Sequence, residues 1–301
     1  MPLLQVRGVD HYYEWVSAAK QFLPSGRPVS DKPVMVFVHG WGGSVRYWKS
    51  TAEALTGTFD CLLYDLRGFG RSTLPRPVPA EVVDLGYELE TYADDLALLL
   101  DQLALEQVYL NAHSTGASVA VLFLDRYPQR VKQAILTCHG VFEYNPLTFK
   151  AFHKVGGYVV AFRPDWFKRV PGIEHMFMAR FLRRPIPLQA KREFLEDFLV
   201  ADAEAALGTI YTAVSQKAAI EMPQAYARLA VPTLLISGEY DQIIPVRLGR
   251  LAASQNASVQ HEIIPNTGHF PMLEDTATYL QVVTDFLQIP VSQQSLPTIG
   301  A

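Results

Sequence analysis

Short, largely apolar runs recur along the chain and alternate with longer segments whose apolar positions follow a helical spacing. Runs of four to six such residues suit strands that are buried on both faces of a parallel sheet. The expected strands are 34–38, 61–64, 108–110, 133–137, 233–237 and 259–264, and the expected helices are 45–55, 89–105, 119–127 and 273–287. This alternation predicts an α/β fold with a mostly parallel central sheet flanked by helices.

The alternation stops between residues 142 and 222. This stretch is rich in aromatic and basic residues, and several prolines interrupt its short helical segments. We expect it to form a helical insertion between two strands, with the core built from residues 1–141 and 223–290. Residues 291–301 contain Ser, Gln, Pro and Gly, and we expect them to form a flexible tail.

Composition narrows the class of protein. The 301 residues are 49% hydrophobic and 19% charged, which excludes intrinsic disorder over most of the length. The chain contains no run of about 18 uncharged apolar residues, so the sequence predicts no transmembrane helix. Arg7 and Asp10 interrupt the N-terminal segment before a signal-peptide core forms, so we expect a cytoplasmic protein. The net charge of −4 argues against nucleic acid as the main partner.

The two cysteines, Cys61 and Cys138, are too few for a disulfide framework. Each lies in an apolar run, so we expect both to be buried thiols that pack as small hydrophobic side chains.

A candidate nucleophile follows the strand at 108–110, where residues 111–117 read NAHSTGA. Ser114 has Ala112 two positions before it and Gly116 two positions after it. On a tight strand-to-helix turn, larger side chains at these positions would collide with neighbouring backbone. An ordinary helix N-cap serine would look similar, so this motif alone leaves both interpretations open.

Two further residues follow later strands. Asp241 comes just after the strand at 233–237, and His269 comes just after the strand at 259–264. The carboxyl ends of parallel strands meet at one edge of a sheet, so both side chains can converge on Ser114. A serine hydroxyl needs a histidine to take its proton and a carboxylate to orient that histidine. Glu239 follows the same strand and is an alternative to Asp241 that the residues alone leave open.

The order Ser…Asp…His, with the serine on a sharp turn, resembles the α/β-hydrolase family over residues 30–145 and 229–288. Residues 39–44, HGWGGS, look like the oxyanion loop of that family, and residues 65–72, DLRGFGRS, look like the turn after its following strand. The resemblance implies catalysis by Ser114, Asp241 and His269, with the backbone N–H groups of Trp41 and Thr115 forming an oxyanion hole. Ala112 and Ala117 depart from the more usual glycines.

The resemblance therefore implies a serine hydrolase that cleaves a carboxylic ester of an apolar substrate through an acyl-enzyme, without cofactor or metal. Thioesters, lactones and carbon–carbon bonds remain open as substrates, as do acyl transfer and a non-catalytic binding role. Haloalkane dehalogenases and epoxide hydrolases share the fold but carry a carboxylate at the position of Ser114, which argues against both.

Other interpretations of the motifs are weaker. The glycines at 40, 42 and 43 lack the Gly-Lys-Ser/Thr of a phosphate-binding loop. His39, His113 and His139 lie near strand ends without metal-ligand spacing, and His139 either lines the pocket or is buried. We expect Asp94 and Asp95 on an exposed helix face.

The insertion matches the place where many members of the family carry a lid over the active site. Residues 150–192 hold ten basic residues against only Asp165 and Glu174. Aromatic residues beside this positive charge predict a cover for an apolar, lipid-like substrate, and peripheral contact with an anionic membrane. Arg180, Arg183 and Arg184 are candidates for that contact, unless they pair with acidic groups of the core. The sequence gives no indication of oligomeric state.

Overall fold

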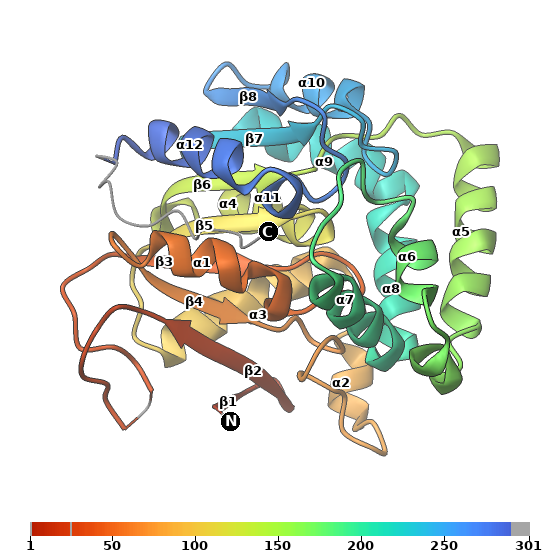
Figure 1. Ribbon diagram of the computed structural model, residues 1–301, viewed down its shortest axis with the longest axis horizontal. Coiled ribbons are helices and arrows are strands. Elements are labelled where there is room, and N and C mark those ends of the chain that lie inside the picture. Colours follow the sequence, from red (N-terminus) through yellow and green to blue (C-terminus); the bar gives the residue numbers. More distant parts are fainter. Residues whose placement is uncertain (1, 25, 290–301) are drawn as a thin grey trace.

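The central sheet holds the molecule together. The computed structural model describes residues 2–24 and 26–289, so the expected tail at 291–301 lies outside the described residues. Within them, eight strands form one sheet in the order β1-β2-β4-β3-β5-β6-β7-β8 (Figure 1). Their bounds are β1 Leu3–Val6, β2 Val9–Val16, β3 Val34–Val38, β4 Asp60–Tyr64, β5 Val108–His113, β6 Val131–Thr137, β7 Thr233–Gly238 and β8 Val259–Ile264. Strands β3 to β8 run parallel, which confirms the predicted α/β class.

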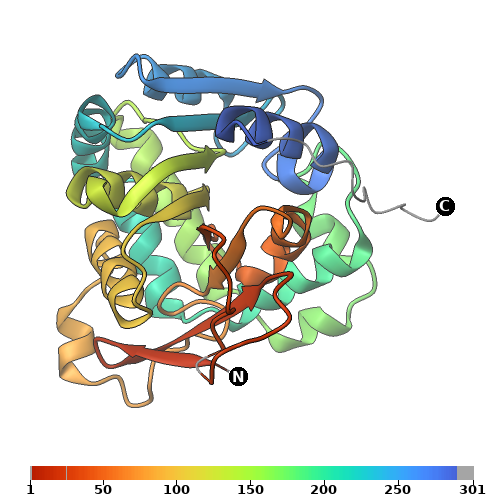
Figure 2. The ribbon, with the colours of Figure 1, turned by 90° about the vertical axis from the view of Figure 1, so that its left-hand side faces the viewer.

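Helices cover both faces of the sheet, as Figure 2 shows. On one face lie α1 (Lys49–Leu55) and α12 (Thr276–Leu287), and on the other lie α3 (Leu89–Gln102), α4 (Thr115–Arg126), α9 (Gln216–Arg228) and α10 (Val246–Ala253). In β3, the side chains of Met35 and Phe37 belong to the hydrophobic core on the α1 and α12 face. Those of Val36 and Val38 belong to the core on the α3 and α4 face. Because side chains of a strand alternate between faces, a sheet buried on both sides needs unbroken apolar runs.

The N-terminal strands were not predicted. β1 and β2 pair antiparallel with each other, and β2 pairs antiparallel with β4. β2 carries Asp10 and Glu14 among apolar residues, and its second half is only half-buried. A partly charged strand at this side of the sheet lacks the continuous apolar run that marked the others.

The prediction that Asp95 is exposed was wrong. Asp95 is buried, and its carboxylate accepts a 3.0 Å hydrogen bond from Nε of the fully buried Arg67. Arg67 belongs to the turn at 65–72, and a buried guanidinium requires a buried counter-ion. The helix pattern could not reveal this, because Arg67 reaches α3 from a distant part of the chain. Asp94 is half-buried and bonds to Tyr127.

The segment between β6 and β7 lies at one end of the sheet (Figure 1). It contains α5 (Pro146–Ala161), η3 (Asp165–Arg169), α6 (Ile173–Met178), α7 (Leu188–Val200) and α8 (Ala203–Ala213). α9 crosses the expected boundary at residue 222 and packs against α4 of the core. The remaining short helices are η1 (Val45–Trp48), α2 (Ala80–Asp84), η2 (Pro128–Arg130) and α11 (Pro271–Glu274). None of the helices in the described ranges combines the length and apolarity that crossing a bilayer requires.

Candidate active site

Ser114 occupies the sharp turn between β5 and α4. Its backbone has φ +53° and ψ −122°, a conformation that L-residues rarely adopt and that costs free energy. The Ser114 N–H donates a 2.9 Å hydrogen bond to the carbonyl of Thr137 in the β6 strand, which helps to hold the turn. A Cβ on Gly116 would collide with the carbonyl oxygens of Val38 and His39. The turn therefore requires a residue without a side chain at Gly116, two positions after the serine.

Asp241 and His269 meet Ser114 at the carboxyl edge of the sheet. Oγ of Ser114 lies 3.0 Å from Nε2 of His269, and Nδ1 of His269 lies 2.7 Å from Oδ2 of Asp241. The other carboxylate oxygen of Asp241 accepts hydrogen bonds from the amides of Ile243 and Ile244. The structure thus brings together all three residues that the sequence singled out.

The Asp241 carboxylate is suited to remain charged. Burial by itself would raise its pKa, but His269 and the two backbone amides stabilise the charged form, and the pKa lies below its ordinary value. A charged Asp241 fixes the proton of His269 on Nδ1 and leaves Nε2 free to accept the proton of Ser114. Glu239 does not reach this group, since its carboxylate accepts a hydrogen bond from the amide of Asn266 at the surface.

The loop after β3 lies directly against the serine. A Cβ built on Gly40 would lie 3.0 Å from Cβ of Ser114 and 3.0 Å from Nδ1 of His113. Within the described residues, the backbone N–H groups of Trp41 and Thr115 donate no hydrogen bond. Thr115 is the first residue of α4, where such N–H groups are normally free and the helix dipole favours negative charge. The two groups can therefore serve an oxyanion.

A buried chain of hydrogen bonds connects this loop to the histidine. The Gly40 N–H donates to Oη of Tyr47, the Tyr47 hydroxyl donates to Nδ1 of His113, and Nε2–H of His113 donates to the carbonyl of His269. Burial and the neighbouring His269 hold the pKa of His113 well below its ordinary value, so this imidazole is neutral. The sequence indicated His113 as a motif residue but gave no signal for Tyr47.

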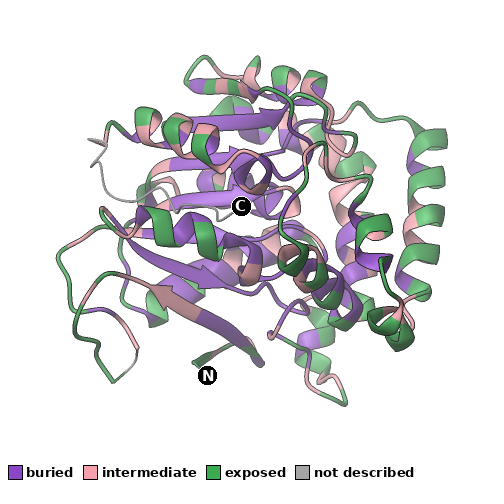
Figure 3. Cartoon of the chain, in the orientation of Figure 1, coloured by how far each residue is buried: buried purple, intermediate pink, exposed green. Residues whose placement is uncertain are grey.

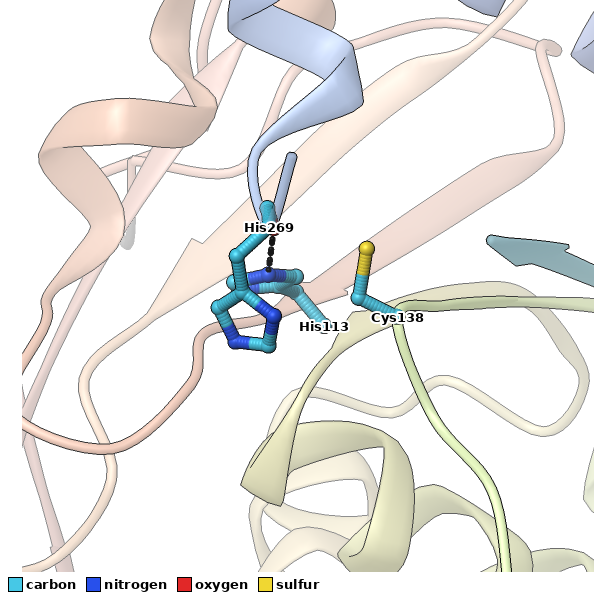
Figure 4. Close-up of side chains that lie close together, drawn as sticks. All are labelled: His113, Cys138 and His269. Atoms are coloured by element: carbon cyan, nitrogen blue, oxygen red, sulfur yellow. Dashed lines mark hydrogen bonds between the residues drawn. The ribbon is translucent and has the colours of Figure 1, made fainter. Parts of the chain in front are cut away.

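Cys138 joins His113 and His269 in a buried group whose potential ligand atoms lie within 4.8 Å of one another (Figure 4). These donors do not suit a metal ion. Both nitrogens of each imidazole already take part in hydrogen bonds. Burial and the nearby Asp241 raise the pKa of the Cys138 thiol well above its ordinary value, so the thiolate that a metal needs is disfavoured. Cys61 and Cys138 are both free and buried, as predicted.

Glu274 ties the histidine loop to the inserted segment, and the sequence gave no signal for it. Its buried carboxylate accepts hydrogen bonds from the amides of Gly268 and Phe270, on either side of His269. The same carboxylate accepts 2.7 and 2.8 Å bonds from the amides of Arg183 and Arg184. We refer to these bonds as the Glu274 clamp. Beside it, the Arg184 guanidinium forms a 2.6 Å ion pair with Asp275.

Aromatic side chains from the inserted segment surround the site. The ring centroid of Phe181 lies 6.0 Å from that of His269, and Phe194 packs 5.1 Å from Phe270. On the other side, Phe198 of α7 packs 5.6 Å from Trp41 of the loop. These rings give the site an apolar border beside His269 and beside Trp41. His139 contributes nothing to this wall, because it is buried and bonded to Ser118 and Tyr226.

Comparison with known proteins gives the family. The family model described as the alpha/beta hydrolase fold matches residues 33–276. The chain belongs to the α/β-hydrolase family. Among relatives, it is 27% identical over 300 residues to an uncharacterized protein of Mycobacterium tuberculosis (strain ATCC 25618 / H37Rv), covering 95% of this chain and 81% of the relative. It is also 27% identical over 278 residues to the 2-hydroxymuconate semialdehyde hydrolase of Pseudomonas sp. (strain CF600), covering 84% and 86%.

Solved structures agree on the α/β-hydrolase fold. The enol-lactonase from Burkholderia xenovorans LB400 superimposes with a TM-score of 0.74 at 20% identity, covering 95% of this chain and all of that one (100%). The similarity in structure therefore extends over nearly the whole chain and is not confined to the sheet. At this identity it identifies the fold and leaves the substrate undetermined.

Proposed function

We propose that this α/β hydrolase is a serine hydrolase that cleaves a carboxylic ester of an apolar substrate through an acyl-enzyme. The observation that carries the proposal is the pair of contacts joining Ser114 to His269 and His269 to Asp241. A hydroxyl placed 3.0 Å from an imidazole nitrogen, with the imidazole oriented by a buried carboxylate, is the arrangement that activates serine.

The reaction has two halves. Oγ of Ser114 attacks the carbonyl carbon while its proton passes to Nε2 of His269, and the resulting oxyanion receives the N–H groups of Trp41 and Thr115. The ester C–O bond then breaks, and His269 returns the proton to the leaving alcohol. A water molecule next attacks the acyl carbon and gives its proton to His269. The bond between that carbon and Oγ of Ser114 then breaks, and His269 returns the proton to Oγ as the acid departs. No cofactor or metal is required.

The apolar substrate is inferred from the rings beside the site. Phe181, Phe194 and Phe198 all come from the inserted segment and stand next to His269, Phe270 and Trp41. Phe194 and Phe198 are buried and Phe181 is half-buried. An acyl chain that covers the exposed part of Phe181 would gain about 25 cal/mol for each Å² of apolar surface that it buries. The inserted segment therefore acts as a lid that also supplies the acyl-binding wall.

Two experiments test this function. A fluorophosphonate probe should label the wild-type protein and leave Ser114→Ala unlabelled, because only an activated serine reacts. A series of p-nitrophenyl esters of increasing chain length should then give kcat/KM values that rise with acyl length before they fall. Absence of labelling would reject the serine hydrolase, and a preference for acetate over every longer chain would reject the apolar substrate.

The bond cleaved is the less specific part of the proposal. The names of the relatives include a semialdehyde hydrolase and an enol-lactonase. Thioester, lactone and carbon–carbon substrates therefore belong in the same panel. Acyl transfer is distinguished by adding alcohols as acceptors and measuring ester formation against hydrolysis.

The cytoplasmic location stays a prediction from the sequence. Peripheral contact with an anionic membrane is likewise a proposal, but Arg184 is a weaker candidate for it than expected. Its guanidinium pairs with Asp275 of the core, which agrees with the alternative that this arginine holds the lid in place. Arg180 and Arg183 form no ion pair among the described residues, so both stay candidates for that contact.

A further inference from the structure

Helix α5 presents an apolar face to solvent. Only Phe149 and Val160 of this helix are buried, and it packs mainly on α8. On its outer side, Leu147 is 81% exposed, Val155 60% and Tyr158 65%. These positions follow the three- and four-residue spacing that places side chains along one helical stripe. Figure 3 shows α5 as an almost wholly exposed helix at the edge of the molecule.

The stripe continues beyond the end of the helix. Phe162 is 64% exposed and contacts the ring of Phe167 in η3, with centroids 5.5 Å apart. The next ring is Trp166, which is 54% exposed and lies 4.8 Å from Phe167. We call the set Leu147, Val155, Tyr158, Phe162 and Trp166 the α5 surface. Surface helices ordinarily turn charged residues outward, so an outward apolar stripe of this length indicates a binding face.

Basic residues border the α5 surface. Lys150 and Lys154 are exposed on α5, which contains no acidic residue, and η3 adds Lys168 and Arg169. The acidic residues nearest to α5 along the chain are Glu143, before the helix, and Asp165, which lies 3.8 Å from Lys168. In the described part of the chain, Lys150, Lys154 and Arg169 have no ion-pair partner. Their charge is available to an external anion.

The charge decides between two occupants of this face. A second copy of the chain, placed symmetrically, would bring the same lysines of both copies toward one interface, where like charges repel. An anionic bilayer offers the complementary charge and an apolar interior for Leu147, Val155 and Phe162. Tyr158 and Trp166 are residue types that favour the boundary between headgroups and acyl chains.

We propose that the α5 surface docks the protein on an anionic lipid bilayer, with α5 lying along the membrane plane. This inference deepens the proposed function, because α5 belongs to the same insertion that provides the rings beside His269. The α5 surface lies in a different part of the insertion from the arginines at 180, 183 and 184. Each Lys near an anionic surface contributes attraction that weakens as the salt concentration rises.

The test is co-sedimentation of the full chain with vesicles. Vesicles of phosphatidylcholine with phosphatidylglycerol are compared with vesicles of phosphatidylcholine alone, at low and moderate salt. The wild type should bind the anionic vesicles at least tenfold more tightly, and salt should reduce this difference. Both the apolar variant L147S/V155S/Y158S and the charge variant K150Q/K154Q should weaken binding at least tenfold.

Matched controls separate this surface from a general effect of lost apolar area or charge. V83S/I220S removes two exposed apolar side chains that lie outside the α5 surface, and K20Q/K132Q removes two exposed lysines outside it. Both controls should bind as the wild type does. Hydrolysis of a soluble short-chain ester should be unchanged in all four variants, because none of these residues contacts Ser114, His269 or Asp241.

Several outcomes would overturn the inference. Equal, negligible binding to both vesicle types at low salt would reject the membrane, as would equal weakening by the control variants. A dimer in analytical ultracentrifugation that L147S/V155S/Y158S dissociates would assign the face to self-association instead. Fluorophosphonate labelling reports on the serine independently, so failure of the hydrolase proposal and failure of membrane docking give different results.

Discussion

The backbone N–H of His269 donates a 2.6 Å hydrogen bond to the carbonyl of Phe181. The residue proposed as the general base is thus bonded through its main chain to the inserted segment. The Glu274 clamp holds the same two stretches of chain together from the other side. The position of the insertion and the position of the imidazole are therefore coupled, and predictions about the site must include residues that never touch substrate.

Ser114→Ala should abolish turnover while leaving the fold intact. Loss of an activated serine lowers kcat roughly 10⁶-fold in well-studied hydrolases, whereas the smaller alanine side chain disturbs little packing here. The measurements are kcat on a short-chain ester and a melting curve by circular dichroism. Retention of more than about a hundredth of the wild-type kcat would reject Ser114 as the nucleophile.

Asp241→Asn should reduce kcat by roughly 10⁴-fold, because an amide no longer fixes the proton of His269 on Nδ1. Glu239→Gln is the matched control. Glu239 lies two residues away on the same loop, and its carboxylate bonds to the amide of Asn266. It should retain nearly full activity. If instead Glu239→Gln loses activity and Asp241→Asn keeps it, the acidic partner has been assigned to the wrong residue.

Glu274→Gln should lower both stability and kcat, although Glu274 does not contact Ser114 or the substrate. The substitution replaces one carboxylate oxygen, which accepts the bonds of the Glu274 clamp, by an NH₂ group. That group is a donor and would face backbone N–H groups. Losing hydrogen bonds to a charged acceptor costs about 1.5–3 kcal/mol. We expect kcat to fall about tenfold at a temperature well below the melting point.

The rate of fluorophosphonate labelling should fall with kcat in Glu274→Gln, and KM should change less. Glu239→Gln again serves as control, since it also removes a charged acceptor of one backbone amide. A purely structural role predicts a lower melting temperature with unchanged labelling of the folded fraction, and that result would exclude Glu274 as a positioning residue.

Stability should decrease as the pH falls below about 6.5. Burial lowers the pKa of His39 to about 4 and that of His139 to about 3, from an ordinary value of 6.5. Between pH 6.5 and these values, the unfolded chain binds protons that the folded protein does not, so acid favours unfolding. At pH 5, each histidine should cost about 2 kcal/mol relative to neutral pH.

Urea unfolding between pH 5 and 8 checks this expectation. His139→Gln removes one of the buried histidines whose pKa is depressed, so its free energy of unfolding should depend less steeply on pH than that of the wild type. A wild-type stability that is constant over this range would contradict the neutral, buried state of both histidines.

The sequence predicted the parallel strands and the three residues at their ends for one physical reason. Strands buried on both faces need unbroken apolar runs, and the polar residue that ends such a run lies at the sheet edge. This located Ser114 and His269 near strand ends and limited the acid to Glu239 or Asp241, and the resemblance to the family then favoured Asp241. The half-buried β2 strand lacks that pattern and was missed.

Residues that act across the fold escaped prediction. Tyr47, Glu274 and the Arg67–Asp95 pair owe their roles to approaches between chain segments far apart in sequence. Glu274 lies only five residues after His269, yet nothing in its neighbourhood distinguishes it from a solvent-exposed glutamate. Its role depends on where residues 183 and 184 return to the core.

The insertion leaves the sheet after β6 and returns at β7, and these two strands are direct neighbours. Its two ends therefore meet at a single seam of the sheet, and a segment of different length could be accommodated there without a change in strand order. A new insertion would still have to form the hydrogen bonds that join the present one to the loop of His269 and to Glu274. A transplanted insertion must present a carbonyl to the His269 amide and two N–H groups to Glu274. The insertion is thus an exchangeable module of this architecture, provided that the main chain at residues 181–184 keeps its course.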